Sequence, residues 1–286
     1  MNYRHGFHAG NHADVLKHLV LVALLDALKR KDAPFFVLDS HAGRGRYDLA
    51  GGQAGRTGEA RAGIHRVWKA APSQPPALVR YLEAVADAQA GEQDSYPGSP
   101  LLVSRALRQQ DRFAACELLP DEAAALKALL AADPRSHVHA RDGYAALKAL
   151  LPPKDGSTRF ARALVLIDPP YEAQDAEYPQ ILAALNDALL RFPQGIFAVW
   201  YPIKQRPSLH PFFRKIATLP AKSALAIELL VRPDDSPLRM NGSGMLLINP
   251  PWQLEKDIEP ALKPLARAMG EAGASWRLTW LKQDKA

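Results

Sequence analysis

Residues 163 to 171 read Ala163-Leu164-Val165-Leu166-Ile167-Asp168-Pro169-Pro170-Tyr171. Five consecutive apolar residues predict a β-strand that is buried on both faces, as in a parallel sheet covered by helices. An acid, two prolines and an aromatic residue follow directly. Ligands of open α/β sheets bind outside the carboxyl ends of the strands, so the tetrapeptide Asp168–Tyr171 is predicted to lie in a ligand site.

Strand and helix patterns alternate on both sides of this segment. A helix is predicted at 13–29 and a first strand at 35–38. Further strands are predicted at 112–118, 136–140 and 195–201, and helices at 120–132, 143–151, 178–190 and 208–216. Segments 223–231 and 244–248 are expected to pair as antiparallel strands at one edge. The alternation predicts a Rossmann-like α/β fold, with a mostly parallel seven-stranded sheet between two layers of helices.

One segment interrupts this alternation. A glycine-rich stretch follows residue 47, and helical patterns occupy 58–69 and 76–90 before the core resumes at Tyr96-Pro97-Gly98-Ser99-Pro100. Ser99 is predicted to cap a helix that runs to about residue 110. We therefore expect residues 48–97 to form an inserted helical subdomain, and residues 1–47 and 98–286 to form the core.

The tetrapeptide suits chemistry at an exocyclic amine. The lone pair of an adenine amine is conjugated into the ring, so the two hydrogens must be drawn out of the ring plane before the nitrogen can attack. Asp168 and the carbonyl of Pro169 can accept these hydrogens, and the prolines fix the backbone in advance. Tyr171 can stack on a base flipped out of its strand. An isolated Asp-Pro-Pro can equally be a strand-terminating turn with an exposed carboxylate.

A similar pattern recurs as Asn249-Pro250-Pro251-Trp252. This copy follows the last predicted strand, which is expected at the edge of the sheet far from the glycine loop at 39–45. We therefore predict a structural role for Asn249 and a chemical role for Asp168.

Three further strand ends carry acids. The first strand ends in Asp39-Ser40-His41-Ala42-Gly43-Arg44-Gly45, which lacks the G-x-G-x-x-G spacing of dinucleotide sites and is closer to the nucleoside loop of a methyltransferase. Glu117 ends the next strand, where a carboxylate can accept both ribose hydroxyls, and Asp142-Gly143 ends the third. Each acid alone fits a solvated surface. Together they favour a bound nucleoside.

The N-terminal segment holds four histidines within eighteen residues, together with Tyr3, Arg4 and Phe7. The histidines match no standard zinc spacing, so we expect no metal. An arginine beside aromatic residues suits contact with an RNA backbone and stacking on a base. The alternative is a loop leading into the first helix, with its histidines hydrogen-bonded inside the fold.

The overall composition narrows the class of protein. Lys and Arg number 36 against 30 Asp and Glu, which gives a formal net charge of +6 and favours a polyanionic partner. Cys116 is the single cysteine and fits a reducing cytoplasm. Residues 1–10 lack the pattern of a secretory signal. The apolar run at 19–25 is too short to span a bilayer, so no membrane association is expected.

The pieces, in this order, resemble the RlmJ family of large-subunit ribosomal RNA methyltransferases, which convert an adenine to N6-methyladenine. The matching blocks are Tyr3 to His18, Leu38 to Gly43, Tyr96 to Pro100 and Ile167 to Glu172. The first block is highly specific, whereas Asp-Pro-Pro-Tyr alone indicates amino-methyltransferases in general.

The resemblance implies a class I methyltransferase fold with a small helical insertion, S-adenosyl-L-methionine as the methyl donor and 23S ribosomal RNA as the substrate. It implies a catalytic role for Asp168 and places Tyr3, His5 and Lys17 near the substrate base, beside Arg4. The expected reaction is direct in-line methyl transfer to a flipped adenine by a monomer. Implied cofactor contacts are His18, His41, Ser99, Glu117, Asp142, Gly143 and Asp168.

Three other classes of protein remain open from the sequence. A DNA adenine methyltransferase shares the fold and tetrapeptide but usually carries a larger recognition domain. A glutamine-modifying methyltransferase prefers Asn-Pro-Pro-Tyr, so Asp168 counts against it. A catalytically silent RNA-binding module would not need Asp168, Glu117 and the glycine loop.

Overall fold

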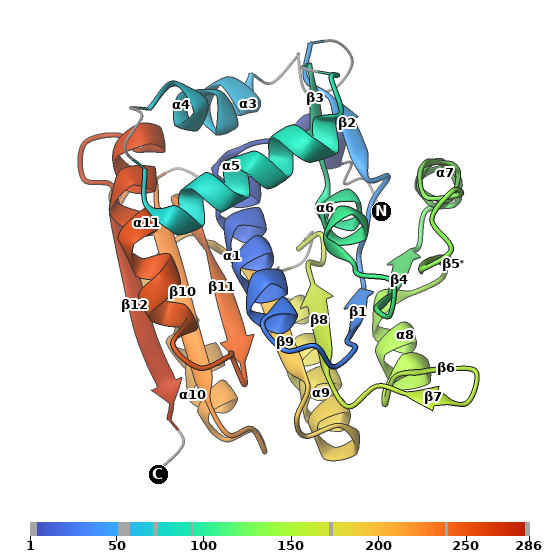
Figure 1. Ribbon diagram of the computed structural model, residues 1–286. Helices are drawn as coiled ribbons and strands as arrows, with labels where there is room; N and C mark the ends of the chain where they lie inside the picture. The colour runs from blue at the N-terminus through green and yellow to red at the C-terminus, as the bar shows by residue number, and fades with distance from the viewer. Residues whose placement is uncertain are drawn as a thin grey trace.

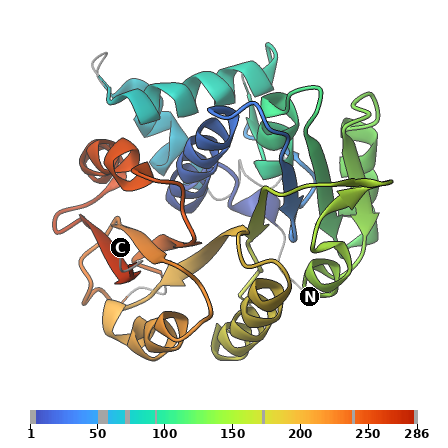
Figure 2. The same ribbon diagram turned by 60° about the horizontal axis from the view of Figure 1, so that its bottom comes forward.

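The computed structural model describes residues 5–50, 58–70, 74–92, 94–171, 174–237 and 240–283. Within these ranges an eight-stranded sheet runs in the order β12-β10-β11-β9-β8-β1-β4-β5, with helices on both faces (Figures 1 and 2). The parallel part comprises β1 (Phe36–Asp39), β4 (Arg112–Glu117), β5 (Ser136–Ala140), β8 (Ala163–Ile167) and β9 (Ile196–Ile203). The antiparallel part comprises β10 (Ala224–Leu230), β11 (Gly242–Ile248) and β12 (Ser275–Lys282).

The predicted α/β class is confirmed, but the predicted number of strands is wrong. The additional strand β12 pairs with β10, so β10 and β11 are not at the edge of the sheet. Trp276, Leu278 and Trp280 alternate along β12 and pack against the core that contains α1. This alternation is the two-residue period of a strand with one buried face.

Each face of the sheet has its own layer of helices. One core involves α1 (His12–Lys29), α5 (Pro76–Gln89), α6 (Ser99–Ala106), α7 (Pro120–Leu129) and α11 (Leu254–Met269). The other involves α8 (Gly143–Leu150), α9 (Gln174–Arg191) and α10 (His210–Ala217). Side chains of β1, β8 and β9 alternate between these two cores. The uninterrupted apolar sequences of these strands follow from this double burial.

The segment between β1 and α6 begins and ends in a short antiparallel pair, β2 (Arg46–Asp48) and β3 (Ser95–Pro97). Between these strands lie α3 (Glu59–Ala62), α4 (Ile64–Lys69) and α5, at the positions predicted for helices. In Figure 1, α3, α4 and the β2–β3 pair lie at the top, towards which β1 and β8 point. Leu78, Tyr81 and Val85 of α5 pack in the same core as α1.

Two predicted details are wrong. Gly98, not Ser99, is the N-cap of α6, and the helix ends at Ala106. The Ser99 hydroxyl instead donates to Asp39 Oδ2 at 2.6 Å, because this buried acid lies within its reach. Neither α11 nor the small elements η1 (His5–Phe7), η2 (Arg206–Leu209), β6 (Lys154–Asp155) and β7 (Thr158–Arg159) were predicted.

The second tetrapeptide follows β11, which runs between β9 and β10 in the interior of the sheet. Because β11 is antiparallel to β9, Asn249 lies at the edge opposite to Asp168. Its amide donates to the carbonyls of Pro193 and Gly195 at 3.0 Å, and its side-chain oxygen accepts from Lys222 N at 2.9 Å. These bonds tie three loops together and explain why an amide occupies this position.

Within the described ranges, no helix combines the length and hydrophobicity needed to cross a membrane.

Candidate active site

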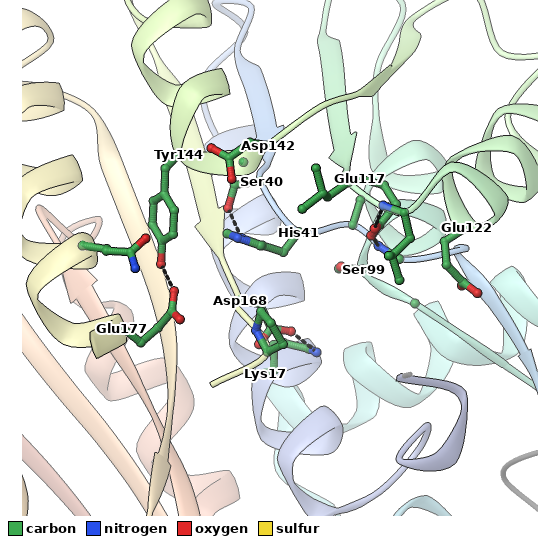
Figure 3. Close-up of a pocket in the computed structure, with 18 of the residues that line it drawn as sticks. Lys17, Ser40, His41, Ser99, Glu117, Glu122, Asp142, Tyr144, Asp168 and Glu177 are labelled. Carbon is green, nitrogen blue, oxygen red and sulfur yellow. Dashed lines mark hydrogen bonds and ion pairs between the residues drawn. The ribbon is translucent and has the colours of Figure 1, made fainter. Parts of the chain in front are cut away.

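A cavity of about 220 Å³ opens at the carboxyl edge of the parallel strands (Figure 3). Its walls come from α1, the loops that follow β1, β4 and β8, and the first turns of α6, α8 and α9. The cavity brings together all the residues predicted to contact the cofactor, and Lys17 with them. These lining residues are Lys17, His18, His41, Ser99, Glu117, Asp142, Gly143 and Asp168.

Asp168 forms an ion pair with a lysine that is almost fully buried. Lys17 Nζ lies 2.6 Å from Asp168 Oδ2 and 2.8 Å from Asp14 Oδ1. Burial alone would lower the pKa of Lys17, but the charges of Asp14 and Asp168 outweigh it and raise this pKa well above its ordinary value. Lys17 therefore remains an ammonium ion. Asp168 keeps acceptor capacity for another donor, since a carboxylate has about four acceptor sites.

The rest of the tetrapeptide is divided between the cavity and the core. Among the described residues, Pro170 joins Asp168 in the cavity wall, and Pro169 is buried. Tyr171, at a φ of 49°, donates its hydroxyl to the carbonyl of Trp200 at 2.7 Å. Its ring lies edge-on to those of Tyr178 and Trp200. In this arrangement Tyr171 packs against protein aromatics, so its stacking on a base remains a prediction.

The loop after β1 presents a neutral imidazole to the cavity. Burial lowers the pKa of His41 to about 4. The Ser40 hydroxyl donates to the carbonyl of Leu166 at 2.9 Å and lies 2.8 Å from His41 Nδ1. Because the hydroxyl has one hydrogen, His41 Nδ1 must be the donor in the second contact, which leaves Nε2 as an acceptor.

Asp39 supports the cavity wall through Ser99, and the sequence interpretation did not single it out. It ends β1, is fully buried, and accepts the hydrogen bond from Ser99. Burial raises the pKa of Asp39 to about 7, although the bond from Ser99 opposes this rise. An acid at the end of a buried strand was the available sequence signal.

Glu117 is held at the cavity by two backbone amides. Gly43 N donates to Oε2 at 2.9 Å, and Leu119 N donates to Oε1 at 2.8 Å. Both oxygens retain acceptor capacity, which suits a pair of ribose hydroxyls. Gly43 has a φ of 64°, and a Cβ there would lie 2.3 Å from the Tyr47 hydroxyl oxygen, so this turn requires glycine.

Asp142 and Gly143 begin α8 beside the loop after β1. Asp142 caps the helix by accepting from Ala145 N at 2.8 Å. A Cβ at Gly143 would lie only 2.1 Å from the carbonyl oxygen of Ser40. Glycine therefore allows the helix start to approach the loop closely enough to form one cavity.

Two further side chains close the cavity between α8 and α9. Tyr144 donates its hydroxyl to Glu177 Oε1 at 2.5 Å, and its ring lies edge-on to His41 at 5.3 Å between centroids. Tyr144 directly follows the predicted Asp142-Gly143 pair. No local sequence pattern connects it to Glu177 on α9.

The N-terminal predictions are only partly covered by the structure. Tyr3 and Arg4 lie outside the described residues, as does the side chain of His5. His18 is fully buried and its Nδ1 lies 2.9 Å from the Tyr96 hydroxyl. Over the described ranges, no group of three or more His, Cys, Asp or Glu side chains is arranged to hold a metal ion.

The residues of the cavity fit S-adenosylmethionine. The acceptor oxygens of Glu117 suit ribose hydroxyls, and those of Asp142 suit an adenine amine. The lining carries five carboxylates against one buried ammonium ion, that of Lys17; the acids are Glu117, Glu122, Asp142, Asp168 and Glu177. An excess of carboxylates favours a sulfonium cation in a partly desolvated site.

A mostly parallel sheet, a reversed strand inserted beside β9, and a nucleoside cavity at the carboxyl edge define a class I S-adenosylmethionine-dependent methyltransferase. A family model described as "Ribosomal RNA large subunit methyltransferase D, RlmJ" matches residues 32–282. The chain belongs to this family.

Relatives match over nearly the whole chain. The chain is 39% identical over 287 residues to "Ribosomal RNA large subunit methyltransferase J" of Haemophilus influenzae, covering 99% of this chain and 100% of the relative. It is 40% identical over 282 residues to the Escherichia coli protein of the same name, with 96% and 98% covered. A crystal structure of a Legionella pneumophila protein superposes with a TM-score of 0.85 at 34% identity, covering 97% of this chain and 99% of that one.

Proposed function

We propose that this protein transfers a methyl group from S-adenosylmethionine to N6 of an adenine in 23S ribosomal RNA. The observation that carries this proposal is the position of Asp168 in the same cavity as the residues expected to bind the nucleoside, with Lys17 2.6 Å from one of its oxygens. The two relatives named as large-subunit ribosomal RNA methyltransferases support the substrate class.

Each protein group has a defined task in this reaction. The bound S-adenosylmethionine supplies an electrophilic methyl group. Asp168 and the Pro169 carbonyl accept the two amine hydrogens and so direct the nitrogen lone pair towards the donor. Asp168 need not be a strong base, because the amine proton becomes acidic only once the new bond has formed. Lys17 Nζ, 2.6 Å from Oδ2, holds the carboxylate of Asp168 in one orientation.

The other residues of the site have binding roles in the same proposal. Glu117 binds the ribose hydroxyls, and Asp142 accepts from the adenine amine of the cofactor. His18, His41, Ser99 and Gly143 shape the cavity around it. Tyr3, Arg4 and His5 contact the RNA next to the flipped base, and Tyr171 stacks on that base once its ring is released. The protein acts as a cytoplasmic monomer, and residues 48–97 form the inserted subdomain.

The decisive experiment is transfer of a labelled methyl group to total RNA from cells that lack this protein, followed by nuclease digestion and identification of the labelled nucleoside. Label in N6-methyladenosine from large-subunit RNA is expected. Label only in DNA or protein would retain the class of enzyme and overturn the substrate. RNA binding with no transfer to RNA, DNA or protein would indicate a silent binding module.

A further inference from the structure

Helix α3, which lies between β2 and β3, holds the turn that precedes α1. Glu59 Oε2 accepts a hydrogen bond from Asn11 Nδ2 at 2.9 Å, and His8 Nδ1 lies 3.0 Å from the same oxygen. The side chains of His8 and Glu59 are 39% and 36% exposed, so their ion pair adds little stability. Asn11 is buried, so its hydrogen bond is the more important of the two contacts.

The backbone of the same turn is packed against the junction of α3 and α4. Ile64 N donates to the Gly10 carbonyl at 2.9 Å. A Cβ at Gly63 would lie 2.1 Å from this carbonyl oxygen. The turn and the junction are thus in direct backbone contact, and movement of one displaces the other.

This turn also fixes the first residues of α1. Asn11 Oδ1 accepts from Ala13 N at 2.9 Å and from Asp14 N at 3.0 Å. Gly10 N donates to Asp14 Oδ2 at 3.0 Å, and Asp14 Oδ1 lies 2.8 Å from Lys17 Nζ. The side chain of Asn11 is therefore shared between Glu59 and the helix cap, and the orientation of Asp14 depends on this turn.

We propose that Glu59 is a positioning residue for the reaction at Asp168, acting through Asn11, Asp14 and Lys17. The inference rests on the proposed function and extends it, because it gives the segment between β2 and β3 a task in the catalytic centre. Continuous contacts of 2.6 to 3.0 Å link Glu59 to the catalytic carboxylate. Loss of the bond to Asn11 loosens the turn and lets Lys17 shift relative to Asp168, and small displacements of reacting groups are costly in rate.

The test compares two substitutions at one position. Glu59→Ala removes the acceptor for Asn11 and is expected to lower kcat about tenfold, with KM for ribosomal RNA and Kd for S-adenosylmethionine changed less than about threefold. Glu59→Gln keeps an acceptor oxygen for Asn11 and loses only the exposed ion pair, so it is expected to retain most of kcat. Glu83→Ala, an exposed carboxylate on α5, is the matched control and is expected to match the wild type.

A second measurement does not depend on the substrate. Amide hydrogen exchange of residues 8–16 should accelerate in Glu59→Ala and remain near wild type in Glu59→Gln. An unchanged kcat in Glu59→Ala, unchanged exchange, or a rise in KM alone would overturn the proposal, the last because it would indicate direct RNA contact. If the wild type methylates no ribosomal RNA, the proposed function fails. The exchange experiment still shows whether Glu59 holds the turn.

Discussion

Asp168 and Lys17 are separated by 151 residues in sequence and by 2.6 Å in the fold. Replacing Asp168 with Ala removes the proposed acceptor for the amine while leaving Glu117 and Asp142 in place. We expect methyl transfer to fall by at least about 10²-fold, with little change in the Kd of S-adenosylmethionine measured by calorimetry. Asp155→Ala, an exposed carboxylate on β6, is the control. Wild-type turnover in Asp168→Ala would refute the catalytic assignment.

Asp39 makes the stability of the folded protein depend on pH. Its pKa is raised to about 7 in the folded protein and returns to the ordinary range of an acid near 4 on unfolding. Between these values the folded state holds a proton that the unfolded state has released, so stability falls as pH rises from about 4 to about 7. Three pH units correspond to roughly 4 kcal/mol as an upper limit.

Asp39→Asn should remove this contribution because the amide cannot ionise. Urea unfolding between pH 4.5 and 8 should show the variant gaining stability relative to the wild type as pH rises. Taking the difference between the two proteins cancels the other titrating groups. Parallel curves for the two proteins would contradict a raised pKa at Asp39.

At this scale, what the sequence could predict depended on whether the pattern was local. The position of Asp168 in the cavity was predictable because the apolar strand and the tetrapeptide that follows it are contiguous in sequence. The Lys17–Asp168 pair was not, because a lysine within a helical pattern gives no sign of which distant carboxylate it meets. Ser99 was placed in the correct site with the wrong partner, since a serine before Pro100 resembles a cap until the buried Asp39 is known.

The start of α8 provides a test at the scale of one element. Gly143→Ala places a Cβ against the carbonyl oxygen of Ser40, and overpacking of this kind costs about 1–3 kcal/mol of stability. Moving α8 away from the loop also separates Asp142 from His41. We expect the Kd of S-adenosylmethionine to rise about tenfold, equivalent to 1.4 kcal/mol.

Gly58→Ala is the control that separates the loss of stability in Gly143→Ala from its effect on cofactor binding. Gly58 has a φ of 66°, so a side chain there strains the backbone, but nothing lies within 4 Å of the added Cβ. The variant should lose stability in thermal unfolding while binding S-adenosylmethionine as the wild type does. If Gly143→Ala bound the cofactor equally well, close approach of α8 to the loop would not be needed for the site.

Elements with one clear pattern were predicted best. Strands β5 and β8 begin and end at the predicted residues. Helix α11 was missed because Pro260 and Pro264 lie inside it, although its buried residues recur at helical spacing. Strand β12 was missed although its apolar residues alternate with Arg277 and Thr279 as in a strand, because its partner β10 is distant in sequence and no hairpin turn links the two.

At the scale of the molecule, the cavity depends on the order of the strands. β8, β1 and β4 are neighbours in the sheet, although α7, β5, α8 and the short strands β6 and β7 lie between β4 and β8 in sequence. This order places Asp168, the loop after β1 and Glu117 along one edge. The alternation of strands and helices predicted the parallel sheet. The rule that ligands of such sheets bind at the carboxyl ends of the strands predicted the position of the cavity. Neither could predict that the helices between β2 and β3 support the start of α1, because that contact depends on packing.

The charge of the whole molecule leads to a prediction about RNA binding. With a net charge of +6, association with RNA should release counterions and weaken as salt rises. Arg4→Ala should lower affinity about equally for different RNA sequences and reduce the slope of log K against log salt by about 1, as expected for one lost phosphate contact. Lys222→Ala removes the same charge at the edge opposite to Asp168, where Lys222 N binds Asn249, and should leave the slope unchanged. Equal slopes for the wild type and Arg4→Ala, measured by fluorescence anisotropy across a salt series, would remove Arg4 from the RNA interface.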